Sequence, residues 1–317
     1  MRQSYENGGL LMRRLLIASF FLLSLMLLAA CGGSDDTASD DSSSSDSETT
    51  ESESGNGILA ELQEKGTVVV GFANEKPYAY EEDGELKGVA VDIARAVFNE
   101  LGIENIEGHL ADFGQLIPGL NAKKFHVITA GMAITPERCE NAAFGEPEMI
   151  YGEGIVVQKG NPKNIYSYKD IAADPDIVVS IMAGATENDF VQQEGVDPSQ
   201  IQSAPDIPAT LSAVESGRAD VTTATAATLQ EALDSLGSDK LELVMEFEQP
   251  DIEGIPSYGA AAFHKDDDDL REAYNEVLYE LKSSGKILEF YEANGFPPEL
   301  TEVPLDITTE MVCNGEV

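Results

Sequence analysis

Arg138 is the side chain of this sequence that is best placed to bind a ligand. It follows a short segment, 127–129 (Val-Ile-Thr), whose apolar and β-branched residues predict a buried strand. Gly131 ends that strand, so Arg138 falls on the loop beyond its carboxyl end. Open α/β sheets bind their ligands at this end, and a guanidinium can hold a carboxylate through two parallel hydrogen bonds. We therefore expect Arg138 to bind an anionic group; a surface ion pair is the alternative.

Strands and helices alternate on both sides of Arg138. The first part of the chain has the order strand, helix, strand, helix, strand, and a second alternation begins after residue 176. This pattern predicts parallel sheets covered by helices. The expected strands are 67–72, 106–110, 127–129, 177–181, 220–225 and 241–247, and the expected helices are 89–101, 113–124, 186–194, 207–216 and 268–284.

Two extended runs, 150–158 and 257–263, connect these two sets of elements. We expect them to cross between two lobes, because each run links one alternating set to the other. The predicted fold class is therefore α/β, a clamshell of two βα sheets joined by two hinge strands. Lobe one is expected to contain residues 58–157 and 258–317, and lobe two residues 158–257.

Residues 1–30 have the features of a signal peptide. Two arginines precede an apolar run, 15–28, that is too short to span a bilayer comfortably. The run leads into Cys31 through Leu-Ala-Ala, which resembles a bacterial lipobox and implies cleavage before Cys31 and lipidation of its sulfur. A plain signal peptide is the alternative. Residues 31–57 contain no large apolar side chain, so we expect a disordered acidic tether and an extracytoplasmic protein that is lipid-anchored to the cell membrane.

The chain is strongly acidic. Its 317 residues include 58 acidic and 19 basic ones, which gives a formal net charge of −39. Such a surface repels nucleic acid, so we expect no nucleic-acid partner. It also suits concentrated salt. We expect a monomer without a cofactor, and no metal site, because His109, His126 and His264 show no ligand spacing.

Four segments together carry a resemblance to a known family. They are GFANEKPYAY, ADFGQLIPGL, TAGMAITPERC and LKSSGKILEFYEANGFPPEL. The sequence resembles the family 3 (polar amino-acid) solute-binding proteins of ABC importers, and within them the ectoine and hydroxyectoine binders, over 58–313. The resemblance implies a type II periplasmic-binding-protein fold, a small zwitterionic ligand and importer permease subunits as partners. The ectoine-specific part rests mainly on Asn74 and Glu75, which stand before Pro-Tyr, and on the motif PERC.

Ectoine combines a carboxylate with a ring amidinium, and the resemblance implies a role for each of five residues. Arg138 would hold the carboxylate, helped by the hydroxyl of Thr186 at the start of a helix. Glu75 would accept from the amidinium N–H groups, and the rings of Tyr78 and Phe113 would face its diffuse charge. The alternatives are a solvated acid for Glu75 and core packing for the two rings, whereas a helix cap at Thr186 is compatible with binding.

Two positions depart from what relatives carry. Binders of α-amino acids look to have an aspartate for the α-ammonium where this chain has Thr225, which argues against an ordinary amino acid because an unpaired buried ammonium is costly. The resembled ectoine binders usually carry a third aromatic residue where this chain has Ala133. The aromatic surface is then expected either to have two sides only or to be completed by Tyr80 or Tyr151.

Cys139 and Cys313 remain if Cys31 is lipidated, and an oxidising compartment favours a disulfide between them. The bridge would close a loop of about 175 residues, worth on the order of 5 kcal/mol in the loop-entropy model. A polar amino-acid binder of the same family is the alternative function. An enzyme of the periplasmic dehydratase type, with Glu75 as general acid or base, is a less favoured one, because no other catalytic grouping is evident.

Overall fold

The computed structural model describes residues 57–296 and 303–317. The expected signal peptide 1–30, Cys31 and all of the expected tether except Gly57 lie outside the described residues. Among the described helices, none combines the length and the apolar character needed to cross a bilayer.

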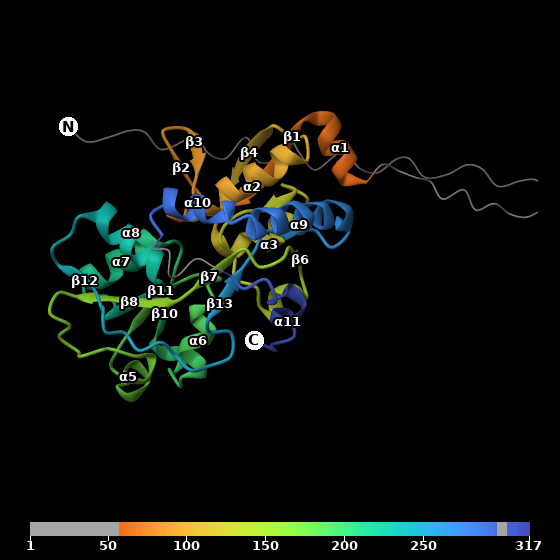
Figure 1. The fold of residues 1–317 in the computed structure, drawn as a ribbon. Helices are drawn as coiled ribbons and strands as arrows, with labels where there is room; N and C mark the ends of the chain where they lie inside the picture. Colours follow the sequence, from red (N-terminus) through yellow and green to blue (C-terminus); the bar gives the residue numbers. More distant parts are fainter. Residues whose placement is uncertain (1–56, 297–302) are drawn as a thin grey trace, which may run out of the picture. The chain divides into compact units, whose positions relative to one another are not determined.

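The first sheet has five strands in the order β4-β1-β5-β14-β6. Figure 1 labels β1, β4 and β6 of this sheet. Strands β4, β1 and β5 run parallel, as the alternating pattern predicts, and β14 is antiparallel to both of its neighbours. Their bounds are β1 Thr67–Phe72, β4 Asn105–Leu110, β5 Val127–Ile128, β6 Ala143–Phe144 and β14 Ala262–Phe263. The helices of this part are α1 Ile58–Lys65, α2 Val89–Glu100, α3 Leu116–Asn121, α4 Pro136–Cys139, α9 Asp268–Ser283, α10 Lys286–Ala293 and α11 Thr309–Cys313.

The apolar face expected on α2 is buried against this sheet. Val89, Ile93 and Val97 are fully inaccessible to solvent, as spacing by three and four residues on one helix face requires. The helix expected at 113–124 is shorter. It begins as the 3-10 turn η1 (Phe113–Gln115), continues as α3, and ends before Lys123, whose φ of 53° is incompatible with a helix.

The second sheet also has five strands, in the order β10-β9-β11-β8-β12. Strands β10, β9 and β11 are parallel, whereas β8 is antiparallel to β11 and β12. The strands are β8 Glu153–Gln158, β9 Val179–Met182, β10 Ile201–Ala204, β11 Val221–Thr225 and β12 Leu241–Leu243. The helices are α5 Tyr168–Ala173, α6 Glu187–Gln193, η2 Pro198–Gln200, α7 Ile207–Glu215 and α8 Ala226–Leu236.

Two short strands join the lobes. Strand β7 (Met149–Tyr151) pairs antiparallel with β13 (Ser257–Gly259), and neither belongs to a five-stranded sheet. The expected run 150–158 is therefore two strands, of which β8 already lies in the second sheet. The boundary that we expected at residue 157 falls inside that sheet, because an apolar run cannot indicate which of two sheets its strand will join. The small hairpin β2 (Tyr80–Glu82) and β3 (Glu85–Lys87) was not expected.

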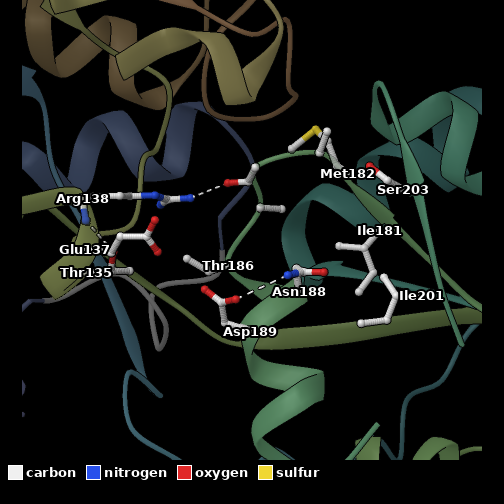
Figure 2. A pocket seen from close by; sticks show the side chains of 13 residues that line it. Thr135, Glu137, Arg138, Ile181, Met182, Thr186, Asn188, Asp189, Ile201 and Ser203 are labelled. Atoms are coloured by element: carbon white, nitrogen blue, oxygen red, sulfur yellow. Dashed lines mark hydrogen bonds between the residues drawn. The ribbon is translucent and has the colours of Figure 1, made fainter. Parts of the chain in front are cut away.

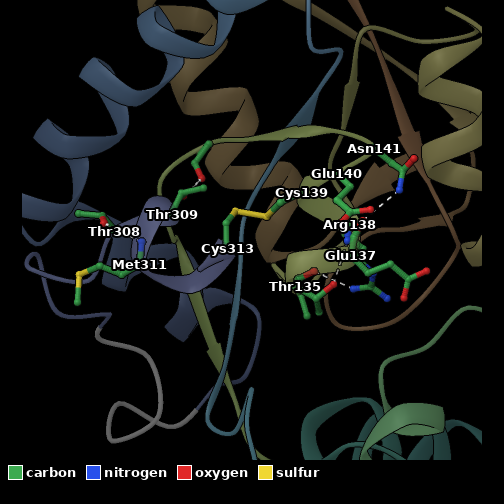
Figure 3. Close-up of a disulfide and its surroundings, with 12 residues drawn as sticks. Thr135, Glu137, Arg138, Cys139, Glu140, Asn141, Thr308, Thr309, Met311 and Cys313 are labelled. Carbon is green, nitrogen blue, oxygen red and sulfur yellow. Dashed lines mark hydrogen bonds between the residues drawn. A yellow bond between two sulfur atoms is a disulfide. The ribbon is translucent and has the colours of Figure 1, made fainter. Parts of the chain in front are cut away.

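The disulfide connects two chain segments that are far apart in sequence. Cys139 ends α4 and Cys313 ends α11, and their Cα atoms are 5.9 Å apart (Figure 3). The bridge therefore ties the C-terminal segment to the turn that carries Arg138.

Candidate ligand-binding site

The six residues expected from the sequence line a single small cavity between the lobes, with a volume of about 30 Å³. They come from both lobes and from segments that are far apart in the chain. Lobe one contributes four of them and lobe two contributes two, namely Glu75, Tyr78, Phe113 and Arg138, and Thr186 and Thr225.

Arg138 is positioned by a capped turn. Thr135 caps α4 by accepting from the Arg138 backbone N–H at 3.2 Å, and Pro136 occupies the first helical position. The Arg138 guanidinium donates at 2.8 Å to the carbonyl of Ala133 and at 2.8 Å to the carbonyl of Gly184 in lobe two. Burial lowers its pKa. Arg138 therefore faces the cavity and also links the two lobes.

A second pocket, of about 430 Å³, adjoins the cavity on the Arg138 side (Figure 2). The two spaces share Arg138, Met182, Ala185 and Thr186 in their walls. Thr186 occupies the N-cap position of α6, as expected, but its side chain makes no capping hydrogen bond to the helix.

Glu75 is the end point of a hydrogen-bond chain that crosses between the lobes twice. Tyr78 Oη lies 2.9 Å from Thr225 Oγ1, which in turn donates at 3.0 Å to Thr228 Oγ1. Thr228 Oγ1 then donates at 2.7 Å to Glu75 Oε1. Since each hydroxyl has one proton, this order makes Tyr78 a donor to Thr225. Burial raises the pKa of Glu75 to about 7, although the Thr228 bond opposes that shift.

Three aromatic rings line the cavity. Tyr78 is 2% exposed and packs edge-on against Tyr151 with centroids 5.3 Å apart, and the Phe113 ring lies 5.5 Å from the Arg138 guanidinium carbon. Tyr80 and Tyr151 were the two candidates for the aromatic residue absent at Ala133, and of these Tyr151 lines the cavity, whereas Tyr80 lies outside it. A glycine is required at 131, because its φ is 62° and a Cβ there would lie 2.6 Å from the Tyr78 ring.

Two further acids in the cavity wall were missed. Glu153 on β8 is 3% exposed and Glu187 at the start of α6 is 5% exposed. Burial first, and then the charge of Glu187, raise the pKa of Glu153 well above its ordinary value, and burial also raises the pKa of Glu187. Glu153 lay in a run interpreted only as a crossover. The signal that was available for Glu187 was its position directly after Thr186.

The wall is therefore acidic with one cation. Three carboxyl groups (Glu75, Glu153 and Glu187) share it with the guanidinium of Arg138, and within the described part of the chain none of these four groups forms an ion pair within 4 Å. Over the same residues, no group of three His, Cys, Asp or Glu side chains is arranged to hold a metal. Such a wall is complementary to a solute with one carboxylate and at least one cationic group.

Comparison with known proteins assigns this chain to a protein family. The model for bacterial extracellular solute-binding proteins, family 3, matches residues 68–295. A probable amino-acid ABC transporter periplasmic-binding protein, y4tE of Sinorhizobium fredii (strain NBRC 101917 / NGR234), is 40% identical over 262 residues, which are 81% of this chain and 86% of that protein. The L-cystine-binding protein TcyJ of Escherichia coli (strain K12) is 25% identical over 248 residues, 75% of this chain and 86% of that one.

Solved structures agree with this assignment. The crystal structure of EhuB in complex with hydroxyectoine has a TM-score of 0.73 and 32% identity, and the match covers 80% of this chain and 97% of that one. An ancestral arginine-binding protein bound to arginine has a TM-score of 0.63 and 28% identity, over 73% of this chain and 98% of that one. The two-lobed periplasmic-binding-protein fold is thus confirmed. The y4tE protein is described as a periplasmic-binding protein of an ABC transporter, TcyJ as a binding protein for L-cystine and the ancestral protein as arginine-binding, which assigns this chain to the extracytoplasmic solute-binding components of transporters rather than to enzymes. The chain belongs to the bacterial extracellular solute-binding proteins, family 3.

Proposed function

We propose that this protein captures a small zwitterion of the ectoine or hydroxyectoine type between its lobes and delivers it to the permease subunits of an ABC importer. The observation that carries the proposal is the grouping of an anion-binding guanidinium, aromatic rings and acids around one interlobe cavity. The similarity to EhuB, whose structure holds hydroxyectoine, supports the same ligand class.

Arg138 would hold the carboxylate of the solute. Its two nitrogens that donate to Ala133 and Gly184 each keep one further N–H, so a bidentate pair of bonds remains available. Glu75 would accept from the amidinium, and the rings of Tyr78 and Phe113 would face its charge at about 0.5–2 kcal/mol per contact.

A polar amino acid is the second candidate, and a specific observation favours it. The argument from Thr225 assumed that Glu75 was the main acid available to an α-ammonium. Glu153 and Glu187 add acceptors that compensate for the threonine, because an ammonium needs about three close acceptors. The amino-acid-binding relatives favour this candidate as well.

Calorimetry with ectoine, hydroxyectoine, glutamine and arginine separates the two candidates. We expect an ectoine-type ligand to bind at least tenfold more tightly than glutamine, a difference of about 1.4 kcal/mol. Phe113→Ala should remove most of that difference, whereas Tyr80→Ala, which deletes a ring outside the cavity, should retain it. Glutamine or arginine binding as tightly as ectoine to the wild type would refute the ectoine assignment and leave the amino-acid candidate.

We also propose that Cys31 anchors the mature protein to the membrane through a lipid. The basis is the Leu-Ala-Ala-Cys motif after the apolar run. Expression of Cys31→Ser in a bacterium with the lipoprotein pathway should move the protein from the membrane fraction to the soluble fraction. An unchanged distribution between the two fractions would contradict the anchor.

A further inference from the structure

We propose that a pocket between the lobes, separate from the solute cavity, binds a small organic cation with an apolar body and thereby holds the two lobes together. This pocket, which we call the α7–α8 pocket, has a volume of about 370 Å³. Its wall has one residue, Glu75, in common with the wall of the solute cavity. Sites for small molecules commonly have volumes of roughly 300–1,000 Å³ and often lie where two domains meet, so this pocket has the size and the location of such a site.

Lobe two supplies an apolar side of the pocket. This side comes from α7 and α8, which contact each other, and it contains Ile207, Leu211, Ala232 and Leu236. Leu236 is the last residue of α8 and is 46% exposed. A ligand with an apolar body would remove this surface from water, which favours its binding.

The acidic groups of the pocket select the charge of the ligand. Glu81 on β2 lines the pocket from lobe one, and Glu231 on α8 lines it from lobe two. Among the described residues, neither carboxyl group has an ion-pair partner within 4 Å. Two like charges that line one pocket from different lobes repel each other, and a cation between them replaces this repulsion with attraction. The pocket is therefore complementary to a cation rather than to an anion.

The positive group in the wall is already paired. Lys76 is the one cation among the lining residues, and its ammonium lies 2.7 Å from Glu82 Oε1 and 4.8 Å from the centre of the Tyr80 ring. Glu82 does not line the pocket, so this ion pair leaves the charges of Glu81 and Glu231 unbalanced. The Tyr80 ring belongs to the wall as well, and its contact with Lys76 is of the kind that an aromatic face makes with a cation.

A cation in this pocket would stabilise the closed arrangement of the lobes. Its apolar body would pack on α7 and α8 and its charge would lie between acids of both lobes, so the ligand requires the lobes to be together. The solute has the same requirement, because the wall of its cavity also comes from both lobes. Two ligands that favour the same arrangement raise each other's affinity by the same factor. The α7–α8 pocket is therefore a regulatory site for solute capture.

Titration calorimetry of the full mature chain tests the pocket, with 2-phenylethylammonium as the probe. We expect one saturable site, and at least threefold tighter binding when the protein is saturated with the tightest-binding solute of the calorimetric panel. The solute affinity should rise by the same factor when the probe is saturating. 2-Phenylethanol and phenylacetate, which carry the same ring without the positive charge, should bind at least tenfold more weakly.

Two double variants with the same change in net charge separate the pocket from the acidic surface in general. Glu81→Gln with Glu231→Gln removes two acids of the wall and should weaken binding of the probe at least fivefold. Glu85→Gln with Asp234→Asn is the matched control, because both residues are exposed on β3 and α8 and neither lines the pocket. It should bind the probe like the wild type. Leu236→Ser should also weaken binding, and thermal melts and circular dichroism report whether each variant folds.

The outcomes separate this pocket from the proposed function. If the solute and the probe compete, the probe occupies the solute cavity and the inference is overturned. Equal effects of the two double variants, or no saturable binding of the probe, would overturn it as well and would leave the proposed function standing. Folded protein that binds no solute of the panel would refute the proposed function, whereas the variants would still decide whether the probe binds in the α7–α8 pocket.

Discussion

Removal of the Arg138 side chain is the sharpest test of the cavity. In the free protein the guanidinium already bonds one carbonyl in each lobe at 2.8 Å, and two of its N–H groups remain for a ligand carboxylate. Hydrogen bonds to charged groups contribute about 1.5–3 kcal/mol each, so two of them are worth about 3–6 kcal/mol. Arg138→Ala should therefore weaken binding by a factor of about 10² to 10⁴.

The fold should survive this change. The turn that carries Arg138 is fixed by its backbone, through the Thr135 cap, and by the Cys139–Cys313 disulfide. Arg138→Ala loses the two hydrogen bonds to carbonyl oxygens, which costs stability. It also removes a buried charge whose desolvation is unfavourable, as its lowered pKa indicates, and this gain offsets part of the cost. We expect the melting temperature without ligand to change by only a few degrees.

Arg138→Lys distinguishes charge from geometry. A lysine ammonium keeps the charge but lacks the fork that can hold Gly184 and a carboxylate at the same time, so its affinity should lie between those of the wild type and Arg138→Ala. The assay is calorimetry with the tightest ligand of the panel. If Arg138→Ala binds within threefold of the wild type, a difference below about 1 kcal/mol, the guanidinium does not hold the ligand and the reasoning fails.

Three other predictions concern pH, closure and the disulfide. Burial raises the pKa of the Glu148 carboxyl from 4.5 to about 8, so the stability that this group contributes is complete below about pH 4.5 and is lost as pH rises through 8. In urea titrations, the unfolding free energy of Glu148→Gln should therefore fall less between pH 5 and 8.5 than that of the wild type, by on the order of 3 kcal/mol. An equal fall in both proteins would contradict this prediction. A Cβ at Gly114 would lie 3.3 Å from the Ala183 carbonyl oxygen across the lobe interface, so the larger side chain of Gly114→Leu should hold the lobes apart. This variant should bind the ligand at least tenfold more weakly than the wild type. If its affinity equals that of the wild type, the close contact at Gly114 is dispensable. Non-reducing peptide mapping of secreted protein should find Cys139 linked to Cys313, and two free thiols would refute the bridge.

The sequence predicted the alternation of strands and helices in both lobes, and its patterns together with the family resemblance indicated six residues of the cavity wall. Turn residues after buried strands place Glu75 and Arg138 at strand ends, and parallel strands bring their carboxyl ends to one edge of a sheet. Local patterns also determine α2, because its apolar face repeats every three to four residues. These features depend on a few neighbouring residues, so they can be read without knowing the rest of the fold.

Only the tertiary structure decided which distant groups meet. The bonds that join Tyr78 to Thr225 and Thr228 to Glu75 connect residues 147 and 153 positions apart, and no periodicity specifies such a pairing. Glu153 was missed for the same reason. The alternation of a strand says which residues share a face, but the sheet that β8 joins, and the cavity that its first residue faces, follow from how the two lobes pack.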